Sequence, residues 1–201
     1  MVRDAAAIGA LPAADATESD LTETEISSRV AYGGHFLELR TDEVRLPDGQ
    51  VTQREYIVHP GAVIILALFD NGDVLMERQF RYPLRRHFYE LPAGKLERGE
   101  PSLETARREL LEETGYHARQ WQLLTRTHPC IGYSDEVIDL YVARELEFEG
   151  RSLDHGEFLD VFRLPFSEAL GWIKSGRISD TKTILGLWWW QQRLSETPPR
   201  T

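Results

Sequence analysis

Three glutamates stand close together near the middle of the chain: Glu109, Glu112 and Glu113. On a helix, Glu109 and Glu113 would lie one turn apart on the same side, with Glu112 close enough to join them. These like charges repel, and the basic pair Arg107 and Arg108 precedes the cluster instead of separating its members. Magnesium pairs carboxylates with substrate phosphate oxygens and would remove the repulsion. The spacing therefore predicts a metal site for phosphate chemistry, with a solvated acidic helix face as the alternative.

A helix over residues 102–114 would position these carboxylates. Pro101 suits its first turn, and Gly115 sits where helices commonly end in a left-handed residue. A stripe of four residues recurs at helical spacing and is expected to be buried beside the acidic face: Leu103, Ala106, Leu110 and Thr114.

The wider segment 94–116 reads GKLERGEPSLETARRELLEETGY. It resembles the Nudix box, G-x5-E-x7-R-E-U-x-E-E-x-G-U with U apolar, at every fixed position. An accidental match is expected below about one in a million starts at background residue frequencies. The resemblance covers residues 23–194 and implies a metal-dependent pyrophosphate hydrolase.

Four shorter runs resemble the ADP-ribose pyrophosphatase branch of that family. They are HPGA at residues 59–62, RQFR at 78–81, ELPAG at 90–94 and GYSDE at 132–136. Members of the branch hydrolyse ADP-ribose to AMP and ribose 5-phosphate. They commonly form homodimers in which the N-terminal hairpin unit packs across the partner.

The resemblance implies a role for each matching residue. Glu109 and Glu113 become magnesium ligands, with manganese as another possible ion. Glu112 is a ligand or its close support, and the backbone carbonyl of Ala93 is a further ligand. Glu112 and Glu113 are also assigned to catalysis through the metal. Four residues are expected to support the site without binding metal: Gly94, Glu100, Arg108 and Gly115.

A carboxylate outside the box should orient the attacking water, and two residues compete for this role. Glu157 resembles the group on the acidic loop before the last strand of the branch, and Glu136 follows a turn-rich run typical of mobile functional loops. We favour Glu157 for the water and Glu136 for substrate contact. Arg81 and Arg54 are candidates for pyrophosphate and ribose contacts, because guanidinium groups pair with phosphate oxygens. Each of the two could instead form a surface ion pair.

One position departs from the branch pattern. The branch usually has a proline immediately before the glycine of the 132–136 run, where this chain has Ile131 and places its proline at Pro129. A different loop curvature would affect the choice of ADP-ribose more than the hydrolysis of a pyrophosphate. Other nucleotide sugars or dinucleotides, such as GDP-mannose, NADH or FAD, therefore remain alternatives. So does a sensor that binds ADP-ribose without turnover, although the box is intact and no DNA-binding segment is added.

Composition limits the partners and the compartment. The 201 residues can bury one sizeable core, and a formal net charge of -10 argues against nonspecific binding to nucleic acid or anionic membranes. The lone Cys130 cannot form an internal disulfide, which fits a reducing cytosol. No stretch approaches about 18 consecutive apolar residues. We expect a cytoplasmic protein that acts on a small nucleoside diphosphate derivative.

The remaining pattern predicts α/β architecture. We expect a disordered tail over 1–21, an N-terminal antiparallel β unit over 22–58, the hydrolase domain over 59–194 and a C-terminal tail over 195–201. The β unit would be a hairpin of residues 35–45 and 51–58, and a second hairpin would join 63–69 to 74–80. Further strands are expected at 88–90, 121–126, 137–143 and 158–163, with helices at 166–174 and 181–193.

This order of elements suggests a mixed sheet with helices on both sides, which agrees with the α/β/α sandwich of the Nudix fold. The run Trp188, Trp189 and Trp190 faces several sides of the last helix. Either that helix packs on its own domain and on a second subunit, or it is deeply buried with one Trp exposed.

Overall fold

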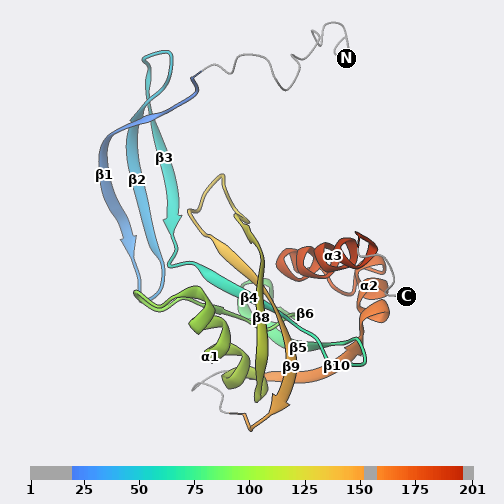
Figure 1. The fold of residues 1–201 in the computed structure, drawn as a ribbon. Helices are drawn as coiled ribbons and strands as arrows, with labels where there is room; N and C mark the ends of the chain where they lie inside the picture. Colours follow the sequence, from blue (N-terminus) through green and yellow to red (C-terminus); the bar gives the residue numbers. More distant parts are fainter. Residues whose placement is uncertain (1–19, 152–157, 197–201) are drawn as a thin grey trace, which may run out of the picture. The chain divides into compact units, whose positions relative to one another are not determined.

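The computed structural model of the chain describes residues 20–151 and 158–196 (Figure 1). It divides into two compact units, with the boundary between Glu55 and Tyr56. Within the described part of the chain, no helix is long and apolar enough to cross a membrane.

The N-terminal unit is a three-stranded sheet in the order β1-β2-β3, formed by Thr24–Gly33, Glu38–Arg45 and Val51–Val58. The sequence predicted the antiparallel unit but only two of its strands. Strand β1 was missed because every one of its residues is exposed, so no alternation of buried and exposed positions marks it. It pairs antiparallel with β2, with irregularities between Glu25 and Ser27 and between Val30 and Tyr32.

In its described residues, the second unit contains seven further strands, three α-helices and a short 3-10 helix at Tyr82–Leu84. The helices are α1 (Ser102–Thr114), α2 (Phe166–Lys174) and α3 (Thr181–Glu196). The strands are β4 (Ala62–Ala67), β5 (Asp73–Arg81), β6 (Arg86–Glu90), β7 (Ala93–Lys95), β8 (Tyr116–Thr127), β9 (Ile138–Phe148) and β10 (Leu159–Pro165).

These strands form two sheets, a mixed one in the order β7-β4-β9-β8 and an antiparallel one in the order β10-β5-β6. The predicted hairpin of β4 with β5 was wrong, because these strands share only an isolated bridge between Leu68 and Val74. Strand β4 instead lies between β7 and β9, parallel to β9. In that central place its residues 63–67 are fully buried, as is typical of a strand covered on both faces.

Two apolar clusters lie on opposite faces of β4. Ile64 and Leu66 belong to the cluster that includes residues of α2 and α3, whereas Val63 and Ile65 belong to the cluster that includes Leu110 of α1. Helix α1 therefore covers one face, and α2 and α3 cover the other (Figure 1). The predicted α/β fold, with a mixed sheet between helices, is confirmed.

Helix α1 has the predicted limits and buried stripe. Ala106, Leu110 and Thr114 are buried, while Leu103 is half-buried. Gly115 ends the helix at φ 77°, and its N–H donates to Leu111 O at 2.8 Å. This left-handed residue turns the chain directly into β8.

The three consecutive tryptophans of α3 divide between core and surface. Trp190 is 8% exposed, whereas Trp188 and Trp189 are 50% and 42% exposed. Two indoles, not one, are thus exposed in this chain. They line a groove of about 790 Å³ with Leu170 of α2.

Gly115 yields a prediction about stability. A Cβ at this position would lie 2.8 Å from the Phe148 ring and 3.0 Å from backbone atoms of residues 150 and 151. Gly72 has a similar φ of +85° but nothing within 4 Å of the same added atom. Gly115→Ala should therefore lower the free energy of unfolding by at least about 1 kcal/mol more than Gly72→Ala does. Urea denaturation of both variants measures this difference, and equal losses would show that the Phe148 side accommodates the methyl group.

Candidate active site

The last two turns of α1 face the short strand β7. Glu113 is only 4% exposed, and its Oε2 accepts a hydrogen bond from the backbone N–H of Ala93 at 3.2 Å. Glu109, one turn earlier, lies against Gly94. The predicted ligands Glu109 and Glu113 thus meet the predicted backbone ligand segment at one bend of the chain.

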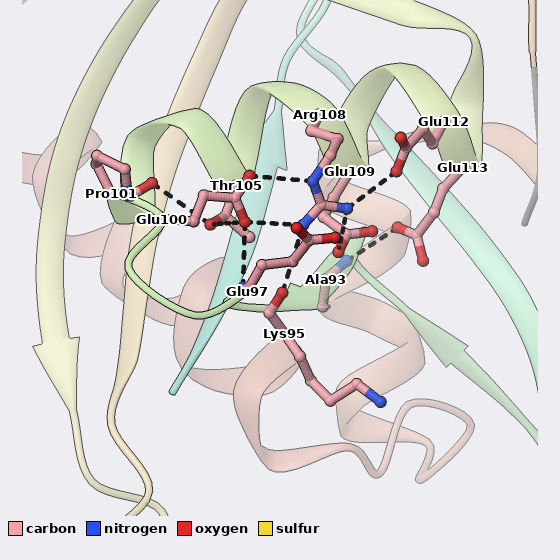
Figure 2. Close-up of polar contacts among 10 residues, drawn as sticks. All are labelled: Ala93, Lys95, Glu97, Glu100, Pro101, Thr105, Arg108, Glu109, Glu112 and Glu113. Carbon is pink, nitrogen blue, oxygen red and sulfur yellow. Dashed lines mark hydrogen bonds and ion pairs between the residues drawn. The ribbon is translucent and has the colours of Figure 1, made fainter. Parts of the chain in front are cut away.

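Arg108 holds the other carboxylates in place, as Figure 2 shows. Its Nη1 donates to Glu109 Oε1 and to Glu112 Oε2, both at 3.0 Å. Its Nε and Nη2 donate to the two oxygens of Glu100 at 3.1 and 3.0 Å. The contact with Glu100 raises the pKa of the Arg108 guanidinium above its ordinary value. One fixed positive charge therefore organises three carboxylates.

Glu100 fixes the loop before α1. It accepts hydrogen bonds from Thr105 Oγ1 at 2.8 Å and from the backbone N–H of Glu97 at 3.2 Å. Its hydrogen bond with Arg108 lowers the pKa of the Glu100 carboxyl to about 2. The carboxylate is therefore ionised at neutral pH, and it holds both the loop and Arg108.

Gly94 leaves the space that Glu109 fills. A Cβ on this residue would lie 1.9 Å from Glu109 Cδ and 2.0 Å from its Oε1. Any side chain here would collide with the predicted metal ligand. Glycine is thus needed at position 94 because Glu109 approaches the backbone closely, and not because the backbone is left-handed there.

The donors gathered here suit a hard divalent cation. Three carboxylates and the backbone of residues 93 and 94 supply oxygen atoms, which are the ligands that magnesium and manganese prefer. Within residues 20–151 and 158–196, no three acidic, histidine or cysteine side chains already enclose a metal position. Arg108 contacts both Glu109 and Glu112, so a metal bound by these two would share their oxygens with the guanidinium.

Arg81 lies at the end of β5 in an ion pair with a buried carboxylate, and the sequence analysis did not identify this partner. Its Nε and Nη2 donate to the two oxygens of Glu90 at 2.7 and 2.8 Å, and Lys182 of α3 contacts the same carboxylate. Glu90 is 2% exposed. Burial raises the pKa of Glu90, but the hydrogen bond from Arg81 and the charge of Lys182 outweigh it and lower that pKa overall. The sequence did contain a signal for this ion pair, because Glu90 is a charged residue in an otherwise apolar strand predicted at residues 88–90.

Glu136 is half-buried beside His59, which the sequence analysis also left without a role. The His59 Nε2 lies 3.7 Å from Glu136 Oε1, while His59 Nδ1 accepts a hydrogen bond from the N–H of Gly61 at 3.1 Å. A neutral ring therefore carries its proton on the nitrogen that faces Glu136. The loop itself is tied to Ile57, whose N–H donates to Tyr133 O at 2.9 Å.

The remaining candidates lie elsewhere. Arg54 forms an ion pair with Glu23 within the N-terminal unit, with Nε donating at 2.9 Å. Glu157 lies outside the described residues, so its role stays a prediction. Ile131, which replaces the usual loop proline, is exposed.

Comparisons with known proteins agree with this geometry. The family model for the NUDIX domain matches residues 58–185, and the model for the nucleoside diphosphate sugar hydrolase N-terminal domain matches residues 23–57. The chain is 40% identical over 169 residues to the ADP-ribose pyrophosphatase of Bacillus subtilis, covering 83% of this chain and 91% of the relative. It is 41% identical over 167 residues to the methanol dehydrogenase activator of Bacillus methanolicus, covering 82% and 90%.

The fold has a counterpart among solved structures. A crystal structure of an ADP compounds hydrolase superposes with a TM-score of 0.80 at 19% identity, covering 89% of this chain and 97% of the other. With the complete glutamate motif on α1 and a family match over most of its length, this chain belongs to the Nudix family of pyrophosphohydrolases.

Proposed function

We propose that the chain hydrolyses ADP-ribose to AMP and ribose 5-phosphate. The observation that carries the proposal is the meeting of Glu109 and Glu113 with the bend at Ala93 and Gly94. Relatives named ADP-ribose pyrophosphatase at about 40% identity support the choice of substrate.

Divalent metal is a general requirement of Nudix hydrolases, and we propose magnesium, with manganese as a substitute. Glu109, Glu112 and Glu113, with the carbonyl of Ala93, would hold it. When bound, the metal neutralises the pyrophosphate and lowers the pKa of a coordinated water. Arg108 keeps Glu109 and Glu112 from turning into solvent, because its Nη1 binds both.

Other residues would bind the substrate and orient the attacking water. Arg81 would contact the pyrophosphate, because it lies on the sheet face that packs against α1. Either Glu157 or Glu136 would orient the water for in-line attack on one phosphorus. The backbone ties between the 130–136 loop and Ile57 support Glu136 as a positioned group.

We also propose a cytoplasmic homodimer. The outer strand β1 carries three exposed apolar residues, Ile26, Val30 and Tyr32. Exposed apolar side chains on an edge strand form an association surface. The net charge of -10 favours a small anionic substrate held by local cations over nucleic acid or a membrane.

The substrate assignment is tested with a panel of ADP-ribose, GDP-mannose, NADH and FAD in the presence of magnesium. We expect the nucleoside monophosphate to appear fastest from ADP-ribose, as AMP. A faster release from another member would reassign the substrate and point to the loop at Ile131. Tight binding of ADP-ribose without any product would favour the sensor role.

Glu113→Gln should reduce turnover by about 100-fold or more, because the metal loses a charged ligand while Gln keeps an acceptor for the Ala93 N–H. The matched control is Glu104→Gln on the same helix, which removes an exposed carboxylate paired with Arg107. Steady-state rates and thermal melting are measured for both. A folded Glu113→Gln protein with normal turnover would remove the metal-helix assignment.

Gly94→Ala should lower turnover by about 100-fold, because the new methyl group displaces the Glu109 carboxylate. The fold should survive, since the colliding atoms belong to the end of a flexible side chain. Gly171→Ala on α2 is the control, with nothing within 4 Å of the added atom. Rates alike in both variants would mean that Glu109 is not a ligand.

Val30→Lys should convert the dimer to a monomer, because two lysines brought together at an apolar contact would be desolvated. Light scattering after gel filtration measures the mass against the 23.1 kDa of one chain. Leu123→Lys, an exposed position on β8, serves as the control and should stay dimeric. A wild-type mass of one chain would contradict the dimer.

A further inference from the structure

Arg81 belongs to the sheet face that packs against α1. Side chains alternate along a strand, so Leu75, Glu77 and Arg81 of β5 share one face. Leu75 packs in the apolar cluster with Leu110, which identifies this face as the one toward α1. Glu90 of β6 lies directly opposite Glu77 in the antiparallel register. Two buried carboxylates thus face each other next to Arg81.

Two donor groups of Arg81 bind Glu90. Both Nε and Nη2 lie within 2.8 Å of its carboxylate oxygens, and Nη1 takes no part in this contact. A buried carboxylate in a medium of low dielectric binds a nearby cation strongly. With Arg81 as its only partner, Glu90 would compete with an anionic substrate for the guanidinium.

Lys182 supplies a second positive charge to the same carboxylate. Its Nζ contacts Glu90 Oε2 and lies 3.0 Å from Asp180 Oδ2, and its side chain is largely buried. Asp180 also accepts hydrogen bonds from the N–H and the hydroxyl of Thr183, at 3.0 and 2.6 Å. The first turn of α3 therefore holds the ammonium group in place.

The first turn of α3 also binds the backbone that leads to the predicted metal site. The N–H of Leu91, the residue after Glu90, donates to Thr183 Oγ1 at 3.0 Å. Lys182 and Thr183 thus hold residues 90 and 91, while Glu113 of α1 holds Ala93. Helix α3 therefore has a fixed position relative to the Arg81 guanidinium.

We propose that Lys182 is a positioning residue for phosphate recognition, which neutralises Glu90 from α3 so that Arg81 presents its Nη1 edge to the substrate pyrophosphate. The inference rests on the proposed function for the contact between Arg81 and pyrophosphate. Lys182 itself touches no substrate. It acts only through Glu90 and Arg81, and this indirect action makes the proposal testable by a double-mutant cycle.

The cycle uses Lys182→Met, Arg81→Met and the double variant. The readout is the Kd of the magnesium complex of α,β-methylene ADP-ribose, measured by calorimetry. Lys182→Met should weaken binding by about tenfold in the wild-type background and by less than about twofold when Arg81 is already Met. A tenfold loss in both backgrounds would overturn the proposal, because Lys182 would then act independently of Arg81.

Further variants separate charge from structure. Lys182→Arg keeps the charge and should bind within about threefold of wild type, whereas Lys182→Gln keeps a donor without the charge and should bind like Lys182→Met. Lys182→Gln also replaces Lys182→Met in the cycle if the latter does not fold. Thr183→Val removes the contacts of the hydroxyl to Leu91 and to Asp180 without changing charge. If Thr183→Val weakens binding equally in the wild-type and Arg81→Met backgrounds, the role of this turn is structural and the proposal fails.

A matched control comes from another buried carboxylate. Asp139 is held by Arg126, with Nε donating at 2.7 Å. Arg126→Met removes a cation from a buried carboxylate elsewhere and should leave the Kd unchanged. A tenfold loss here would show that the assay reports general destabilisation.

The outcome is separable from that of the proposed function. A wild-type protein that binds the analogue but does not hydrolyse ADP-ribose would refute the proposed function and leave the cycle interpretable. If the analogue does not bind, the cycle is measured with magnesium pyrophosphate, which contains the group that Arg81 is expected to contact. Additive effects with that probe would overturn the role of Lys182.

Discussion

The repulsion between Glu109 and Glu112 has to be balanced before any substrate arrives, and Arg108 does so from within the same helix. A guanidinium offers several donors in a fixed plane, which lets one residue bind two carboxylates through Nη1 and a third through its other edge. Lysine, with its single ammonium group, could not hold this geometry. The rest of the site is arranged around that contact.

The surrounding residues make the arrangement rigid. Glu100 binds the far side of the guanidinium and is itself held by Thr105, so the loop and the helix are fixed together. Gly94 permits the close approach of Glu109, and the N–H of Ala93 orients Glu113. Preorganisation of this kind places the carboxylates without requiring them to be assembled during the reaction.

The local part of this site was readable from the sequence, because residues 94–115 contain the carboxylates, their arginine and both special glycines within one short segment. Contacts between distant segments were not. Glu90 and Lys182 are ninety-two residues apart, and no periodicity links a strand charge to a helix charge over that separation. Strand β1 was not predicted because none of its side chains is buried, so its sequence shows no alternation of apolar and polar residues. The turn between β4 and β5 has the residues of a hairpin, and these residues led to the wrong prediction of a hairpin. The turn residues do not determine the partner of β4, which pairs with β9 instead.

The bracing of residues 90 and 91 by α3 also bears on how the protein is made. A nascent chain that has reached α1 already contains every glutamate of the motif, yet the buried charge of Glu90 still lacks the ammonium group from residue 182. Domains fold as units while synthesis proceeds from the N-terminus. The order of translation therefore keeps the phosphate-binding side of the site incomplete until the start of the last helix has left the ribosome, long after the metal-binding side has been synthesised.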